Sequence, residues 1–136
     1  MSDVPRETQR CSSLAELGVE GLITFLYYKD LEKAASFYEV VMGFELTVDQ
    51  GWAKIYRVMD GAHVGVVDES RGYHRASPTK PVMVTLVVPD VDAWYRYLRG
   101  KGVKTLSEPH DVEELGLRAF LLEDPEGYVI EIQKFL

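Results

Sequence analysis

The stretch that decides the fold is LITFLYYKDLEKAASFYEVVMGFEL, residues 22–46, because its pattern returns 60 residues later as VMVTLVVPDVDAWYRYLRGKGVKTL, residues 82–106. Each copy begins with a short run of β-branched and aromatic residues, which favours a strand. An aspartate follows, Asp30 or Asp90, of the kind that caps a helix N-terminus, and apolar residues then recur at helical spacing. Each copy ends its helical pattern near a glycine. The pattern therefore predicts a strand and a helix in each copy.

Alternating segments with turn residues between them follow each predicted helix. They cover residues 44–48, 52–61 and 62–68 in the first copy, and residues 103–109, 117–127 and 128–135 in the second. Asp60-Gly61 and DPEG, residues 124–127, are typical of hairpin turns. Each copy thus predicts the order βαβββ. The expected fold class is α+β, with two tandem modules forming a curved mixed-sheet platform, the helices outside and a trough on the open faces.

The length of 136 residues favours one domain, which we expect to span residues 21–136. Its repeats would cover residues 21–68 and 81–136, and the polar, proline-containing segment 69–80 would link them. Residues 1–20 form a leader, which we expect to be partly flexible.

Composition excludes several classes of protein. The net charge of −7 would repel a phosphate backbone, so nucleic-acid binding is not expected. No apolar run approaches the ~18 residues that span a bilayer, so no membrane association is expected. The leader lacks the apolar centre of a secretory signal, and the single cysteine, Cys11, fits a reducing compartment. Cytoplasmic localisation is the resulting expectation.

The paired pattern resembles a known family. The phrases YYKDLEKAASFYEVVMGFEL, residues 27–46, and LEDPEGYVIEIQ, residues 122–133, look like those of the vicinal oxygen chelate superfamily, which includes glyoxalase I, bleomycin and fosfomycin resistance proteins and extradiol dioxygenases. The resemblance covers residues 22–135. It implies the platform fold described above, and proteins of this fold are often homodimers, so a homodimer is expected.

The resemblance also implies where a metal would bind. Metal-dependent members place one ligand, typically His or Glu, on the first and on the last strand of each repeat. Those four positions here hold Ile23, Gly65, Met83 and Glu131. One carboxylate is too few to hold a divalent metal, so no cofactor is expected. A site rebuilt from His63, Glu131 and a loop histidine remains an alternative.

Strand alternation predicts which residues line the trough. The predicted ligand-binding residues are aromatic, apolar or polar side chains on the inner strands: Phe25, Tyr27, Trp52, Tyr56, His63, Met83, Thr85, Phe120 and Glu131. The sequence leaves open which face of their strands Tyr56 and Phe120 occupy.

Glu131 is the candidate catalytic residue, although a purely structural role stays open. A carboxylate between Ile130 and Ile132 needs a hydrogen-bond donor, such as Tyr27, Tyr56, Lys54 or His63, or else favours its protonated form. Ionised, it would accept from an amine or hydroxyl of a ligand, and protonated it would suit acid–base chemistry.

The predicted function is a metal-independent small-molecule binding protein resembling the bleomycin-resistance type, with a cationic or aromatic ligand held in the trough. The alternative is a glyoxalase-like lyase, isomerase or dioxygenase with a divalent metal, which the missing ligands disfavour. Metal-free catalysis by Glu131 and a partner-binding role are further alternatives, so the sequence leaves open whether the protein is an enzyme.

Overall fold

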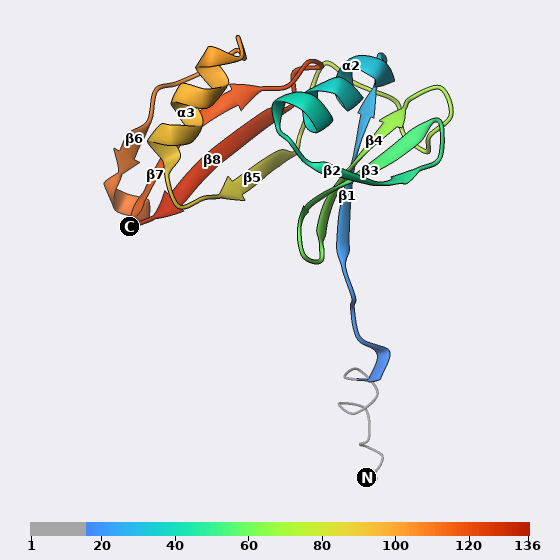
Figure 1. Ribbon diagram of the computed structural model, residues 1–136, viewed down its shortest axis with the longest axis horizontal. Coiled ribbons are helices and arrows are strands. Elements are labelled where there is room, and N and C mark those ends of the chain that lie inside the picture. Colours follow the sequence, from blue (N-terminus) through green and yellow to red (C-terminus); the bar gives the residue numbers. More distant parts are fainter. Residues whose placement is uncertain (1–15) are drawn as a thin grey trace, which may run out of the picture.

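The computed structural model describes residues 16–136, and within them each repeat forms a four-stranded sheet with one main helix (Figure 1). The first repeat contains β1 Leu22–Tyr28, α2 Leu31–Ser36, the π-helical turn η1 Phe37–Val41, β2 Glu45–Asp49, β3 Ala53–Met59 and β4 Ala62–Asp68. The second contains β5 Met83–Val87, α3 Val91–Gly100, β6 His110–Val112, the 3-10 turn η2 Glu113–Leu115, β7 Leu117–Glu123 and β8 Val129–Phe135. The predicted α+β class is confirmed. Cys11 and most of the leader lie outside the described residues.

Both sheets are mixed. Their strand orders are β1-β4-β3-β2 and β5-β8-β7-β6, and in each the first and last strands of the repeat pair in parallel. The remaining neighbours pair antiparallel. The parallel pair places the first strand of each repeat beside its last strand, which are the two strands that carry the family's ligand positions.

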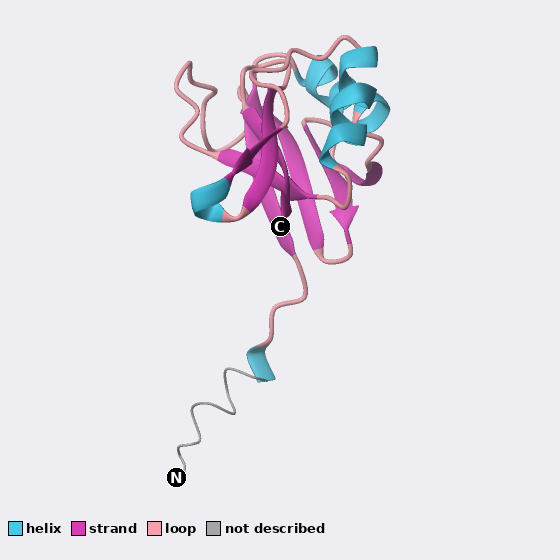
Figure 2. Ribbon diagram, turned by 90° about the vertical axis from the view of Figure 1, so that its left-hand side faces the viewer, coloured by secondary structure: helices cyan, strands magenta, loops and turns pink. Residues whose placement is uncertain are grey.

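The helices lie together on one side of the sheets (Figures 1 and 2). Each begins at the predicted aspartate: Asp30 Oδ1 accepts a hydrogen bond from the Lys33 N–H at 3.1 Å, and Asp90 Oδ1 accepts one from the Ala93 N–H at 3.0 Å. Under the helices, apolar side chains of both repeats form one continuous core, which includes Leu26, Tyr56, Val66, Leu98, Phe120 and Ile132. Within residues 16–136, no helix covers the opposite faces of the sheets.

A buried polar cluster joins the two repeats. Asp124, in the turn between β7 and β8, is 5% exposed and accepts hydrogen bonds from the hydroxyls of Tyr28 and Tyr38 in the first repeat. Its other oxygen accepts the backbone N–H groups of Glu126 and Tyr128, both at 2.9 Å. Burial raises the pKa of both tyrosines well above the ordinary value, so the hydroxyls keep their protons and remain donors. Every donor of this cluster therefore has an acceptor.

The strand predicted within residues 103–109 is observed later in the chain, as β6. Within residues 103–109 the structure has an isolated bridge between Thr105 and Leu122, and the strand that borders β7 is β6, three residues long. The Leu121 N–H donates a hydrogen bond to the Ser107 hydroxyl at 3.0 Å. A side-chain oxygen therefore accepts the bond that a backbone carbonyl of a neighbouring strand would accept. Pro109 has no N–H to donate to a ladder.

Residues 16–21 extend away from the sheets below β1 (Figure 1). No helix within residues 16–136 has both the length and the apolar character needed to cross a membrane.

Candidate ligand site between the two repeats

The strand register brings the inherited ligand positions together in pairs. On β4, Gly65 lies opposite Phe25 of β1, and on β8, Glu131 lies opposite Thr85 of β5. Ile23 and Met83 lie two residues before Phe25 and Thr85, on the same open faces of the sheets. The two pairs therefore occupy equivalent places in the two repeats.

In the first repeat an aromatic ring fills the ligand position. A Cβ atom built on Gly65 would lie 2.4 and 2.5 Å from two ring carbons of Phe25, and 3.4 Å from a methyl carbon of Ile23. Real Cβ atoms do not approach other carbons at 2.5 Å, so the Phe25 ring rests directly on the glycine backbone. The space into which a ligand side chain would project from β4 is occupied by hydrocarbon.

In the second repeat the carboxylate is present and has a partner. The Thr85 hydroxyl donates to Glu131 Oε1 at 2.9 Å. Glu131 is half-buried rather than enclosed. The donors expected from the sequence, Tyr27, Tyr56, Lys54 and His63, make no hydrogen bond to it in the described chain, and Thr85 takes their role.

These residues do not fit a divalent metal. Ile23 and Gly65 have no donor side chain, and the Met83 thioether is a poor ligand for hard or borderline metals. Within residues 16–136, no three His, Cys, Asp or Glu side chains converge. The loop histidines of the rebuilt alternative have other contacts: His74 packs on Tyr27 at a ring-centroid distance of 5.3 Å, and His110 Nδ1 contacts the Glu108 carbonyl at 2.9 Å.

A cleft of about 510 Å³ lies between the repeats. The beginnings of β1 and β4, the end of β3 and Phe44 form one wall, and β5 with α3 forms the other. Among its lining residues are the apolar Leu22, Phe44, Val58, Val84, Leu86 and Trp94, and the polar Thr24, His63 and Thr85. The Nδ1 atom of His63 is buried and has no hydrogen-bond partner among the described residues. An apolar cleft with few polar groups is typical of a small-molecule site.

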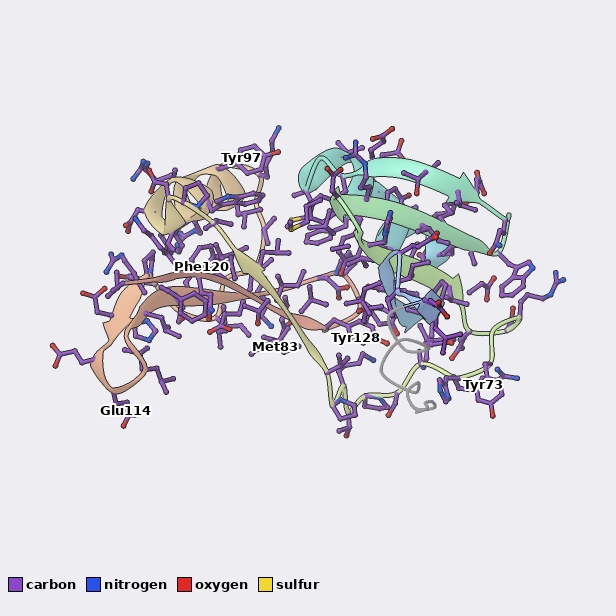
Figure 3. All side chains as sticks on the ribbon, turned by 90° about the horizontal axis from the view of Figure 1, so that it is seen from below. Tyr73, Met83, Tyr97, Glu114, Phe120 and Tyr128 are labelled. Carbon is purple, nitrogen blue, oxygen red and sulfur yellow. The ribbon has the colours of Figure 1, made fainter. Side chains whose placement is uncertain are left out.

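The structure brings three of the predicted ligand-binding residues to this cleft: His63, Met83 and Thr85. Figure 3 labels Met83 on β5, the strand that borders the cleft. Glu131 adjoins the cleft through its hydrogen bond with Thr85.

The prediction that Tyr56 and Phe120 line the ligand site is wrong. Tyr56 lies opposite Val64 and Phe120 opposite Ile132, so both face the helices and are fully buried. The Phe120 ring, labelled in Figure 3, packs against the Tyr95 ring of α3 with 5.2 Å between their centroids. Burial, together with the neighbouring Glu39 carboxylate, raises the pKa of Tyr56 to about 12. Neither ring reaches the open faces of the sheets.

A one-residue shift explains both corrections. An unbroken hairpin at Asp60-Gly61 would place Tyr56 opposite Gly65, but the register shifts between Arg57 and Met59 and turns Tyr56 to the other face. In the second repeat, Tyr128 belongs to the turn rather than to β8, which begins at Val129 and pairs with Glu123. Starting the strand one residue earlier would have placed Phe120 opposite Glu131.

The remaining predicted residues lie apart from the cleft. Phe25 and Tyr27 border a smaller hollow of about 240 Å³ beneath the linker. Trp52 borders an open groove at the other end of the first repeat, where the Arg71 guanidinium lies 5.6 Å from its ring centroid. The predicted residues therefore do not form one aromatic trough within one chain.

Sequence reasoning missed the aromatic residues of the cleft, Phe44 and Trp94. Trp94 belongs to the apolar stripe of α3, which indicated the core. The spacing of Phe44 and Trp94 did not distinguish them from core residues, so the sequence held no signal for their place in the cleft.

Each repeat thus forms a βαβββ module in which the first and last strands pair and a helix covers one face of the sheet. Proteins built from two such modules form one structural class. The chain belongs to the Glyoxalase/Bleomycin resistance protein/Dioxygenase superfamily, whose family model matches residues 21–132.

Individual relatives agree with this assignment. The uncharacterized protein YraH of Bacillus subtilis (strain 168) is 28% identical over 121 residues, which cover 82% of this chain and 94% of that protein. TioX from Micromonospora sp. ML1 has a similar structure, with a TM-score of 0.71 and 24% identity over 85% of this chain and 98% of that chain. Lactoylglutathione lyase from Agrobacterium tumefaciens matches with a TM-score of 0.68 and 19% identity, over 83% of this chain and 91% of that chain. At these identities the two structures establish the shared fold.

Proposed function

We propose that the protein is a metal-independent small-molecule binding protein whose ligand lies in the cleft between the repeats. The Phe25 ring on Gly65 carries the proposal, because it occupies the space that a metal-ligating side chain needs. Three of the four inherited positions, Ile23, Gly65 and Met83, offer no suitable donor atom. Chemistry that requires a metal to polarise two substrate oxygens has no support from these residues.

The cleft favours a flat, largely apolar ligand with one polar group. Its walls are mostly hydrocarbon, and burying an apolar ligand there is favourable by about 25 cal/mol per Å² of apolar surface. Because His63 Nδ1 has no partner among residues 16–136, a ligand hydrogen bond to it removes an unsatisfied polar atom. The net charge of −7 and the nearby Glu131 carboxylate favour a cationic or neutral ligand over an anionic one.

We propose further that a second copy of the chain covers the open faces. Large apolar side chains on β1 and β5 support this: Ile23 is 41% exposed, Phe25 42%, Met83 48% and Val87 62%. Exposed apolar patches of this kind are typical of protein interfaces. Light scattering after size exclusion should give twice the chain mass, and Val87→Lys should shift the protein toward the monomer.

The test of function combines metal analysis with ligand binding. Protein purified without chelators should contain no stoichiometric transition metal, and added zinc or nickel should leave its melting temperature unchanged. A panel of naphthalene derivatives that differ only in carrying an ammonium, a neutral or a carboxylate group should quench tryptophan fluorescence and raise the melting temperature, in that order of affinity.

A blocked cleft provides the specific control. Val84→Phe places a ring among the lining residues and should abolish binding, whereas Val40→Phe, on the exposed surface of η1, should not. One equivalent of bound metal, together with turnover of a glutathione thiohemiacetal, would favour the lyase alternative and contradict the proposal.

A further inference from the structure

The linker between the repeats folds back onto the open face of the first sheet. A Cβ atom on Gly72 would lie 2.5 Å from a Val67 methyl carbon and 2.8 Å from a ring carbon of Tyr27, so the linker backbone rests directly on both side chains. The His74 ring then meets the Tyr27 ring edge to face, with 5.3 Å between centroids. The linker is therefore packed against the sheet.

Hydrogen bonds within the linker fix its shape. Arg75 Nη1 donates to the carbonyl oxygens of Glu69 and Gly72, at 2.8 and 3.0 Å. The Ala76 N–H donates to Glu69 Oε1 at 2.9 Å. These bonds turn the chain so that residues 74–80 pass over the end of β1, and they hold Arg75 in place before any ligand arrives.

The hollow of about 240 Å³ between the linker and β1 has the opposite charge from the protein as a whole. Three basic residues, His74, Arg75 and Lys80, line it, and no acidic residue does, although the chain carries a net charge of −7. The Lys80 ammonium lies 5.1 Å from the centroid of the Tyr128 ring and donates to the Ser77 carbonyl. Two hydroxyl residues, Ser77 and Thr79, also border the hollow.

Arg75 and Lys80 are among the cations of the described chain that form no ion pair with a carboxylate, unlike four others. Lys54, Arg57, Lys104 and Arg118 each pair with a carboxylate within 4.0 Å. Within residues 16–136, Arg75 and Lys80 bond to carbonyl oxygens alone, and neither forms an ion pair with a carboxylate within 4.0 Å. The wall opposite them is aromatic, because Phe25 and Tyr27 line the same hollow.

We infer that this hollow is a binding pocket for a small planar carboxylate, separate from the cleft between the repeats. The carboxylate meets Lys80 and the unused N–H groups of Arg75, and its ring lies against Phe25 and Tyr27. Charge-assisted hydrogen bonds to ammonium and guanidinium groups supply the affinity, and the size of the hollow limits the ligand to about one ring.

Benzoate is the probe, with benzamide as its neutral isostere. Titration of ¹⁵N-labelled protein should give saturable shifts of the amide resonances of Tyr27 and of residues 74–77, 79 and 80, and benzamide should bind at least about tenfold more weakly. Lys80→Gln should weaken benzoate binding by about tenfold or more. Lys101→Gln is the matched control, because Lys101 also lies over a tyrosine, at 5.7 Å from the Tyr97 centroid, but borders none of the pockets described above.

Denaturation midpoints of both variants should equal that of the unmodified protein, which excludes unfolding as the cause of weaker binding. The inference is overturned by shifts that do not saturate, by equal affinity for benzamide, by an equal loss in Lys101→Gln, or by shifts that map to Trp94 and the cleft. Binding at the cleft in the naphthalene experiment is unaffected by any of these results, so the two proposals fail separately.

Discussion

The two repeats carry different side chains at the same register position. Phe25 faces Gly65 in the first repeat, and Thr85 faces Glu131 in the second. The first pair packs a ring on bare backbone, whereas the second is a hydroxyl bonded to a carboxylate. Both pairs lie on the open faces, away from the shared core, so the fold tolerates either chemistry there. The difference shows that the residues that form the core of this fold are separate from the residues that line its open faces.

The hairpin turns of the two repeats differ in the same way. Asp60 follows β3 directly and Asp124 follows β7 directly. The Asp60 side chain is fully exposed, with Arg57 at 3.4 Å as its ion-pair partner. Asp124 is buried and accepts four hydrogen bonds, two of them from the other repeat. Equivalent aspartates thus serve a surface turn in one repeat and the junction in the other.

The largest expected effect on stability comes from removing the hydrogen bonds by which Asp124 joins the two repeats. Asp124→Ala removes the acceptor of two buried hydroxyls and two N–H groups, of which only the Tyr28 hydroxyl keeps a second acceptor, the Tyr38 hydroxyl at 3.2 Å. It should lower the free energy of unfolding by about 3–5 kcal/mol. Asp60→Ala, at the equivalent turn, should change it by less than about 0.5 kcal/mol. Urea denaturation of both variants measures the difference, and similar losses in the two would contradict the assigned role of Asp124.

Gly65→Ala should have the next largest effect. The added methyl group collides with the Phe25 ring, and overpacking of this kind destabilises by about 1–3 kcal/mol. Gly100→Ala is the control, since no atom beyond its chain neighbours and its own helix backbone lies within 4 Å of the added methyl group. In the double variant Phe25→Ala/Gly65→Ala, the loss should be less than the sum of the single losses, as measured by thermal denaturation. Strict additivity would show that the ring does not rest on Gly65.

Thr85→Val tests the polar pair of the second repeat. It removes the donor to Glu131 and should lower the free energy of unfolding by about 0.5–1 kcal/mol, less than at Gly65 because Thr85 is exposed. Glu131→Gln keeps an acceptor for the hydroxyl and should have a smaller effect in the same urea denaturation experiment. If Thr85→Val is neutral and Glu131→Gln is not, the carboxylate has another partner.

The smallest expected effect on stability comes from the ion pair between β7 and α3 in the second repeat. Arg118 donates to both oxygens of Asp92, at 2.9 and 3.0 Å, and these hydrogen bonds hold the pKa of Asp92 below its usual value. A lowered folded-state pKa adds stability above the unfolded-state pKa, and that stability is lost as the pH falls through the folded-state pKa. Arg118→Gln should raise the pKa of Asp92 and remove this acid dependence.

An NMR titration of the Asp92 carboxyl carbon measures this change. Lys104→Gln, which breaks the ion pair with Glu123 at 3.3 Å, is the control and should leave the pKa of Asp92 unchanged. An unchanged value in Arg118→Gln would contradict the assigned cause of the shift.

Much of the fold could be predicted from the sequence because each element has a local cause. Asp30 and Asp90 cap their helices as predicted, since an aspartate side chain can reach the third N–H that follows it. The family's four positions could be placed by counting within the repeat. The candidate site was harder, because the faces of Tyr56 and Phe120 depend on one bulged residue and one turn residue, and a shift of one residue reverses every side chain.

The sequence by itself determined the duplicated βαβββ order, the turns and the lack of metal donors at Ile23, Gly65 and Met83, because these follow from residue type and spacing along the chain. Only the tertiary structure decided that Phe25 covers Gly65, that Asp124 is buried between the repeats, and that the linker places Lys80 and Arg75 at the same hollow as Tyr27. Those contacts join residues 40 to about 100 positions apart, and their formation depends on how two packed sheets sit on one core.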